Sequence, residues 1–531
     1  MVLEKDDDFN HDSIVRRLKT KGRDGDRMIT YVDFLFSPAV YMLFTILNMK
    51  FIFKRGHPAY NRIKLYGIIM YAHELNVYTL TGVSYLCRND EVLKCFTNGI
   101  TPSPNCLDEF LTKSNRLIMK SISICTLVEL NDLGCLDFRR IYCDSTDAKI
   151  NGSINYKVKL DDLKCFKLLN KWNLLHNGNA KKMNKNRKKL EKLLKTYEND
   201  EEMVKYIKHA LNNYSLYRKN AYRKYDVFKK YLDDDPEGYV CVMFPEARFM
   251  KTKRGRFEFA LLIQQCMLRN GIVLPGLLQS EPNDGKALNK IIIDLKETFQ
   301  IMEKLQKYYG ERRNYKEIRN ALEIAIMVLD SGYFTDENLE AAYDHDLNIL
   351  IMPRLIARRI NDKLREKKFK DVEYLIEEEV DKVTKRHADI TSNGYVCPNN
   401  IHSEECVKKE INSEFNRIRE GKPEVFKEFS FNYDFNCPVD CPVKDICTIN
   451  PIEDRISVLK YLMIKKLTNK RYRDIYSERL SANEQIFGDY KGIIEIIKLF
   501  GSNQTAAQNH LYIINSCRNL KRKVTIKNTI N

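Results

Sequence analysis

Two short apolar runs in this 531-residue chain end on an aspartate, and this feature constrains the fold most. The run at 324–329 is followed by Asp330 and a Gly-Tyr turn, and the run that starts at 136 leads to Asp144 in a Ser-Thr turn. A carboxylate directly after a buried strand is unfavourable unless it is hydrogen-bonded, paired or bound to a cation. The pattern therefore predicts strands that present charge at one edge of a sheet.

Strands and helices alternate around these runs. After strand-like segments within 239–280, the pattern predicts a helix, a strand, a helix and a further strand, at 286–323, 324–330, 336–344 and 347–353. This order is typical of α/β layers. Strand ends on one edge of an open α/β sheet converge where ligands bind, so we expect Asp144 and Asp330 to lie side by side.

Two adjacent carboxylates repel each other unless a cation neutralises them. Oxygen ligands with few histidines or cysteines nearby suit Mg²⁺ or Mn²⁺. A third carboxylate would complete a two-metal site that acts on a phosphodiester. Glu484 is the candidate, and Lys491 shares its predicted helix face, with Tyr476 and Arg479 upstream to contact DNA phosphates.

Each of the three carboxylates also has a purely structural explanation. Asp144 could form an Asx-turn, and Asp330 could cap nearby amides. Glu484 stands three positions after Ser481, which is the spacing of a capping box at a helix start. Only their joint appearance, in this order, favours the metal site.

The balance of charge points to a polyanionic partner. Lys and Arg outnumber Asp and Glu by 89 to 72, for a net charge of +17. Nucleic acid is the most common such partner, although AT-rich coding also enriches lysine. The basic helical segment 181–195 could follow phosphates or could be a solvated face. The predicted hairpin beside the sheet carries the basic residues that we expect to contact DNA, Arg248, Lys251, Lys253 and Arg254.

The N-terminus is acidic and polar without a secretory signal, so a cytoplasmic, nucleoid-associated location is expected. The segment 36–53 is interrupted by Asn48 and Lys50 and is predicted to be a buried helix. Fifteen cysteines in this context indicate reduced thiols or metal ligands. The number and short inner spacing of Cys397, Cys437, Cys441 and Cys447 suit a structural Zn²⁺, while four independent thiols are the alternative, and His402 or Cys406 could substitute as ligands.

Several blocks of the chain resemble the DDE transposases of bacterial insertion sequences, in the IS1182-like branch of the IS4-type group. The resemblance runs in order over about residues 30–525. It rests on RGHPAYNRIKL (55–65), TPSPNCLDEF (101–110), CDSTDAKINGS (143–153), FPEARFMKTKRG (244–255), LQSEPNDGKAL (278–288), LDSGYFTDENL (329–339) and YSERLSANEQIFGDYK (476–491). The cysteine segment is also similar to a block of that family.

The resemblance implies an RNase H-like catalytic domain, Mg²⁺-dependent cleavage at transposon ends and strand transfer by the freed 3′-hydroxyl. Asp144, Asp330 and Glu484 match the catalytic, metal-binding triad, and Tyr476, Arg479, Glu484 and Lys491 fall on a Tyr-Arg-Glu-Lys signature. The partners implied are the terminal inverted repeats and the target, both double-stranded DNA, and a homodimer on that DNA.

Some positions depart from the family pattern. Arg479 and Glu484 are five positions apart where four is commoner, and Leu268 and Arg269 replace an expected aspartate. Two alternatives therefore remain. One is a catalytically inactive, transposase-derived DNA-binding protein. The other is an RNase H-like repair nuclease, which would cut without specific terminal repeats.

The chain is accordingly divided into five parts. Residues 1–28 are expected to be flexible, and 29–135 to form an all-helical DNA-binding domain. Residues 136–355 are expected to form an α/β, RNase H-like core with a basic helical insertion at 160–235. A charged, cysteine-rich, zinc-binding insertion follows at 356–452, and helices at 453–531 complete the catalytic core.

Overall fold

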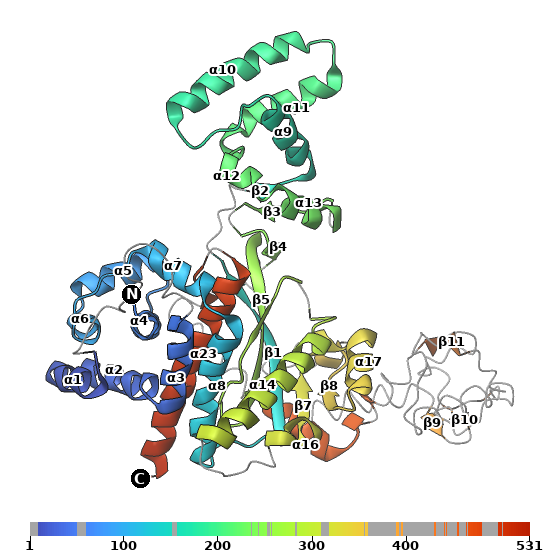
Figure 1. The fold of residues 1–531 in the computed structure, drawn as a ribbon. Helices are drawn as coiled ribbons and strands as arrows, with labels where there is room; N and C mark the ends of the chain where they lie inside the picture. The colour runs from blue at the N-terminus through green and yellow to red at the C-terminus, as the bar shows by residue number, and fades with distance from the viewer. Residues whose placement is uncertain are drawn as a thin grey trace.

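The computed structural model describes most of the chain up to residue 358 and the last helix (Figure 1). It covers 9–49, 60–150, 157–309 apart from 235, 243, 252–254, 256 and 282–283, and 318–358 apart from 355. Beyond that it covers 389–391, 394–396, 430–431, 440, 442, 454–455, 463–464, 466–479 and 497–530 apart from 502. The described residues form a mixed α/β structure with many helices, as the alternation of patterns predicts.

A mixed sheet forms the centre of the structure. Its strands run in the order β2 (Lys157–Val158), β3 (Val240–Cys241), β4 (Arg248–Lys251), β5 (Phe257–Leu268), β1 (Arg140–Lys149), β7 (Ile326–Leu329) and β8 (Asn348–Ile351). β6 (Leu277–Gln279) pairs with β5, and β13 (Ile497–Lys498) pairs with β1. The central strand β1 is antiparallel to β5 and parallel to β7, and β7 is parallel to β8.

The expectation that β1 ends at Asp144 is wrong. The strand continues to Lys149, because the long strand β5 pairs with it without interruption from Ile141 to Lys149. Asp144 is therefore a residue within a strand and does not form an Asx-turn at a strand end. The other expected strand end is confirmed, since β7 stops at Leu329, directly before Asp330.

Residues 11–28, expected to be flexible, are helical. Helix α1 (His11–Leu18) is capped by Asn10, whose side chain accepts a hydrogen bond from the Ser13 amide, and α2 (Gly22–Leu35) follows. Ile14 and Leu18 are fully buried, so this segment packs into the core. The helices that follow are α3 (Pro38–Met49), α4 (Arg62–Glu74), α5 (Leu80–Asn89), α6 (Glu91–Thr97), α7 (Pro104–Lys113) and α8 (Arg116–Asp132).

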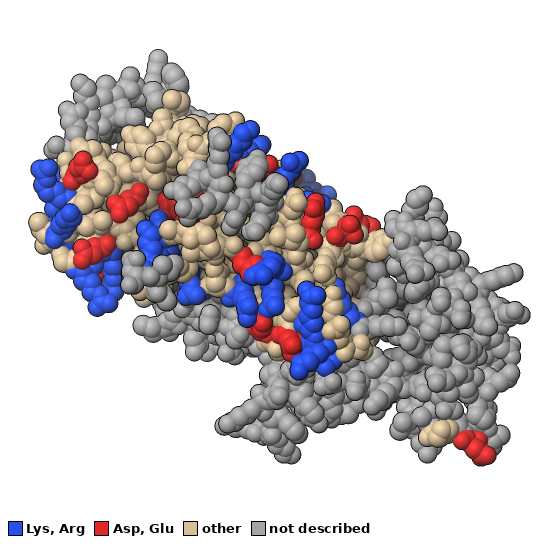
Figure 2. Space-filling view, turned by 90° about the horizontal axis from the view of Figure 1, so that it is seen from below, with Lys and Arg blue, Asp and Glu red and all other residues tan. Residues whose placement is uncertain are grey.

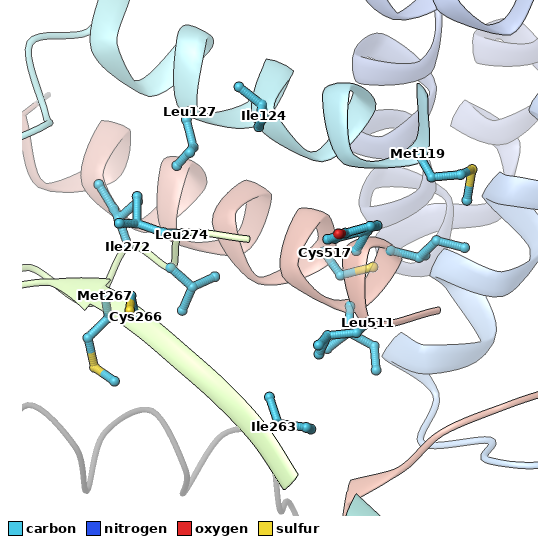
Figure 3. Close-up of a cluster of buried hydrophobic side chains, with 14 of the residues drawn as sticks. Met119, Ile124, Leu127, Ile263, Cys266, Met267, Ile272, Leu274, Leu511 and Cys517 are labelled. Carbon is cyan, nitrogen blue, oxygen red and sulfur yellow. The ribbon is translucent and has the colours of Figure 1, made fainter. Parts of the chain in front are cut away.

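The N-terminal helices and the sheet share one hydrophobic core. The C-terminal helix α23 (Gln504–Ile530) lies between β5 and α8, and Figure 3 shows its Leu511 on the side toward β5. The thiol of Cys517 in the same helix donates to the Met70 carbonyl over 3.8 Å. Polar contacts also hold α23 in place. The hydroxyls of Ser516 and of Tyr66 lie 3.0 Å apart, and Asn519 Nδ2 donates to the Val273 carbonyl over 3.0 Å. The helical region is thus packed as part of the sheet's own core.

The basic insertion folds as a lobe at the outer end of the sheet (Figure 1). Its helices are α9 (Leu160–Lys171), α10 (Ala180–Thr196), α11 (Glu201–Asn212), α12 (Lys219–Tyr222) and α13 (Tyr225–Asp234). They enclose a second core that includes Phe166 and Phe228, both fully buried. The strands β2 and β3 join this lobe to the sheet.

The remaining elements cover the sheet and its edges. α14 (Leu288–Tyr309) occupies most of the helix expected at 286–323, whose middle lies outside the described residues, and α16 (Ala321–Ile324) leads into β7. α17 (Asp336–Asp344) matches its expected bounds. Two small ladders, β9 (Asp389–Thr391) with β10 (Gly394–Val396) and β11 (Ser430–Phe431) with β12 (Asp454–Arg455), lie apart from the main sheet.

The helix expected at 36–53 is α3, and five of its residues, Ala39, Val40, Leu43, Phe44 and Leu47, are buried. None of the described helices alone has the length and apolar character required to cross a membrane. The segments His11–Leu35 and Pro38–Met49 meet that requirement only when they are taken together, and they are bent by 73° with respect to each other.

Candidate active site

Asp144 lies within β1, and Asp330 directly follows the neighbouring parallel strand β7 at the same level. In the register of β1 and β7, Cys143 is paired with Leu329, and each aspartate is the next residue along its strand direction. Because the strands are parallel and their pairing ends at Cys143 and Leu329, both aspartates lie at the carboxyl end of the paired segment. The structure therefore brings the two aspartates together, as their positions after apolar runs predict.

A single arginine bridges the two carboxylates. Arg479 Nη2 lies 2.9 Å from Asp330 Oδ1, and Arg479 Nη1 lies 3.8 Å from Asp144 Oδ2. The Arg479 side chain is only 10% exposed, whereas the Asp330 side chain is 38% exposed. The guanidinium between the carboxylates is thus shielded from solvent. Of the two aspartates, Asp330 is the more exposed to solvent.

The ring of Tyr476 contacts the guanidinium of this arginine. The guanidinium carbon of Arg479 lies 5.4 Å from the centre of the Tyr476 ring, within range of a cation–π contact. Burial raises the pKa of Tyr476 to about 12, although the nearby guanidinium of Arg479 opposes that shift. The phenol is therefore neutral at physiological pH and does not add negative charge to the aspartate pair.

Glu478 attaches the helical segment 470–479 to β1. Its carboxylate accepts hydrogen bonds from Arg140, from the Tyr142 hydroxyl over 2.8 Å and from Arg269 over 3.2 Å. Burial acts to raise the pKa of Glu478, but the hydrogen bonds from Arg140 and Tyr142 outweigh it and hold the pKa below its usual value. Arg269 is thus one of the partners of Glu478, the residue that precedes Arg479.

A fourth carboxylate, Asp284, was not predicted as a site residue. Its Oδ2 accepts a hydrogen bond from Ser145 Oγ over 2.8 Å, and its Oδ1 accepts one from Gln264 Nε2 over 2.8 Å. Ser145 follows Asp144, and the Tyr333 hydroxyl donates to Gln264 Oε1. Asp284 therefore joins the strand that carries Asp144 to the loop that follows Asp330.

The loop after Asp330 fits closely against Asp284. Ser331–Tyr333 forms the short 3-10 helix η3, and a Cβ placed on Gly332 would lie 3.0 Å from Asp284 Oδ2. Asn338 Nδ2 also donates to the Asp284 carbonyl over 2.8 Å and to the Tyr333 carbonyl over 3.1 Å. The signal for this role is the sequence Pro-Asn-Asp-Gly at 282–285, because aspartate and glycine are typical of loops that make local hydrogen bonds.

We predict that Asp284→Asn destabilises the protein by about 2–3 kcal/mol, because an amide nitrogen in place of Oδ1 or Oδ2 leaves a buried donor without an acceptor. Ser145 and Gln264 are 6% and 2% exposed, so water does not replace the lost acceptor. Urea unfolding at constant m-value would measure this. The exposed Asp226→Asn serves as the control and should change stability by less than about 0.5 kcal/mol. Equal effects of both changes would contradict the role of Asp284 as the acceptor for these two buried side chains.

Two predicted DNA contacts, Arg248 and Lys251, lie at the far end of the sheet from the aspartates. Arg248 pairs with Ala260 on β5, whereas Asp144 pairs with Gln265, which places them five residues apart along β5 and about 17 Å apart in that direction. The Arg248 guanidinium lies 4.4 Å from the centre of the Tyr231 ring. These residues are therefore separate from the carboxylate pair, and Arg248 contacts the lobe through Tyr231.

Several predicted site residues lie outside the described residues. They are Glu484, Lys491, Lys253 and Arg254, and the cysteines proposed for zinc, Cys397, Cys437, Cys441 and Cys447. Within the part of the chain that the structure describes, no group of three or more His, Cys, Asp or Glu is arranged so that it could hold a metal ion. The third ligand and the zinc site stay predictions.

Comparisons of this chain with protein-family models, with curated proteins and with solved structures found no match.

Proposed function

We propose that this protein is a DDE-type DNA transposase that cleaves DNA at element ends and joins the freed 3′-hydroxyl to a target. The observation that carries the proposal is the position of Asp144 and Asp330, each directly after the last paired residues of β1 and β7, with Arg479 in contact with both. Two carboxylates at this spacing with one arginine between them carry a net charge of −1 and attract a further cation.

The donor set fits a hard divalent cation. Carboxylate oxygens are the ligands that Mg²⁺ and Mn²⁺ prefer, and Asp330 is open to solvent from which the ion would come. Asp144 and Asp330 would hold the ion, with Glu484 as the third ligand. When bound, divalent cations in such a site stabilise the charge on the attacking and leaving oxygens of a phosphodiester.

The chain's own residues account for how the phosphate would be held. The fork of Arg479 now faces Asp330, and the same planar fork suits two oxygens of a phosphate. Tyr476 and Glu478 keep this side chain in place. Asp284 fixes the distance between the strand of Asp144 and the loop of Asp330. An RNase H-like core is part of the proposal, and the central strand β1, with antiparallel β5 on one side and parallel β7 on the other, supports it.

One observation favours a second candidate, an inactive transposase-derived DNA-binding protein. Arg479 already neutralises part of the charge of the aspartate pair, as it would in a site that no longer binds a metal ion. Such a protein would bind DNA ends and never cut them.

Cleavage of the gene's own flanking DNA distinguishes the two. A labelled duplex that carries the short inverted repeats beside the gene is incubated with the protein and Mg²⁺, and a duplex of shuffled sequence serves as the control. Nicks at the repeat boundary on the first duplex alone support a transposase. Equal cutting of both duplexes indicates a nuclease, and specific binding without any cutting indicates the inactive relative.

A further inference from the structure

The lobe helix α10 carries a straight stripe of lysines on the side that faces away from the lobe's core. Its inward side consists of Asn186 and Leu190, which are buried, with Met183, Leu193 and Leu194 packed on the same core. At about 100° per residue, five exposed lysines fall within an arc of about 80° on the opposite side. They are Lys181, Lys185, Lys188, Lys192 and Lys195.

Helix α10 carries more positive charge than is needed to keep an exposed helix face soluble. Ala180–Thr196 contains eight basic residues and one acidic residue, Glu191, for a net charge of +7. The lysines of the stripe stand three or four positions apart, where like charges repel each other and weaken the helix. Lys181 and Lys182 lie in the first turn, where the helix dipole favours acidic residues instead.

The neighbouring acidic residues do not compensate this charge. Glu202 of α11 and Asp161 of α9 pair with Lys164 and Lys205, at 3.9 Å in each case. Among the residues that the structure describes, none forms an ion pair with a lysine of the stripe. By contrast, basic and acidic side chains are interspersed over the described part of the face shown in Figure 2, which is turned away from the lobe.

The helix is nevertheless held firmly in this orientation. The Asn179 side chain caps it by accepting a hydrogen bond from the Lys182 amide over 3.2 Å, and Asn186 Nδ2 donates to the Leu174 carbonyl over 3.1 Å. The stripe is therefore presented on a fixed frame at the outer edge of the lobe (Figure 1). From Lys181 to Lys195 it extends about 21 Å, which is the axial length of about six base pairs.

We propose that the lysine stripe of α10 is a docking surface for the phosphate backbone of double-stranded DNA, without regard to sequence. It is a second contact, separate from the aspartate pair, and it does not depend on cleavage chemistry. Lysines provide point charges to phosphates and read no base edges from such a stripe, so the contact adds affinity and not specificity. Its charge is complementary to a polyanion, and its straight course suits a duplex backbone.

The test compares two triple variants with the same change in charge. Lys185→Gln, Lys188→Gln and Lys192→Gln neutralise the middle of the stripe. Lys19→Gln, Lys304→Gln and Lys527→Gln neutralise exposed lysines on other parts of the molecule. Affinity for a random-sequence duplex is measured without divalent metal at several salt concentrations. Each phosphate contact that is lost lowers the slope of log affinity against log salt by about 0.9.

We expect the stripe variant to lose roughly 10- to 50-fold in affinity and about two to three units of salt slope. The control variant should stay within about threefold of wild type on the same physical grounds. Glutamine keeps helix propensity, so the control variant should unfold at the wild-type urea midpoint. The stripe variant should unfold at that midpoint or slightly above it, because it loses repulsion between like charges. Equal losses in the two variants, or stronger binding of wild type to duplex RNA or to anionic vesicles than to DNA, would overturn the proposal.

The outcome is separate from that of the proposed function. A wild-type protein that binds duplex DNA through the stripe but never cleaves supports the docking surface and rejects the transposase. A protein that cleaves its flanking repeats supports the transposase. If its stripe variant also binds DNA like wild type, the docking surface is rejected.

Discussion

Replacing Asp330 by asparagine is expected to lower the rate of end cleavage by at least about 10³-fold, while the protein still folds and binds DNA. Asparagine has almost the same shape but lacks the negative charge that would hold a divalent cation. The free energy of unfolding should change by less than about 1 kcal/mol, because Arg479 keeps Asp144 as a counter-charge at 3.8 Å. Initial nicking rates and urea unfolding measure the two effects.

The matched control is Asp344→Asn, an exposed aspartate at the end of α17, which should cleave at the wild-type rate. The combination of lost cleavage with retained stability and binding is what separates a metal ligand from a structural residue. A rate for Asp330→Asn within tenfold of wild type would contradict the proposed metal site.

The position of Asp330 could be predicted from sequence because its signal is local. A run of apolar residues, a carboxylate and a Gly-Tyr turn fix where β7 ends, and α17 then begins with the Thr335 cap, which accepts a hydrogen bond from the Asn338 amide. The course of β1 past Asp144 is not local. It depends on pairing with β5, more than a hundred residues later, so the turn-like sequence around Ser145 gave the wrong strand end.

The helical structure of residues 11–28 was missed for a similar reason, whereas helices were expected from residue 29 onward. Apolar residues are sparse in this segment, and Ile14 and Leu18 become core residues only because α1 packs against α2 and α6. The hydrogen bonds of Asp284 also depend on elements far apart in sequence, although its Pro-Asn-Asp block stands out in the sequence. The sequence thus predicts which polar side chains are candidates for the site. It does not predict their hydrogen-bond partners, because these depend on how distant segments pack together.

Arg479 shows this difference most clearly. The sequence pattern predicts that it contacts a DNA phosphate, and in the structure its guanidinium is paired with Asp330 and lies near Asp144. A guanidinium beside two carboxylates occupies the place where a divalent cation would be attracted. The two roles are compatible if the fork turns from Asp330 to a phosphate when a cation binds, and this exchange can be measured without DNA.

Arg479→Gln is expected to lower the free energy of unfolding in metal-free buffer by about 3–5 kcal/mol, because it leaves two carboxylates without their buried counter-charge. Mg²⁺ should then stabilise the variant more than it stabilises wild type, since the ion no longer competes with the guanidinium. An ion at 100 times its dissociation constant adds about 2.7 kcal/mol. Unfolding curves at increasing Mg²⁺ concentration measure the gain for each protein.

Two further variants make the interpretation specific. Arg479→Lys keeps the charge but not the planar fork, and should lie between wild type and Arg479→Gln in both stability and response to Mg²⁺. The double variant Asp330→Asn with Arg479→Gln removes one carboxylate, so its response to Mg²⁺ should be largely lost. If Mg²⁺ gives Arg479→Gln no more stability than it gives the double variant, the aspartate pair does not bind the ion. In that case Arg479 is the permanent partner of Asp330, and the inactive DNA-binding protein becomes the better description.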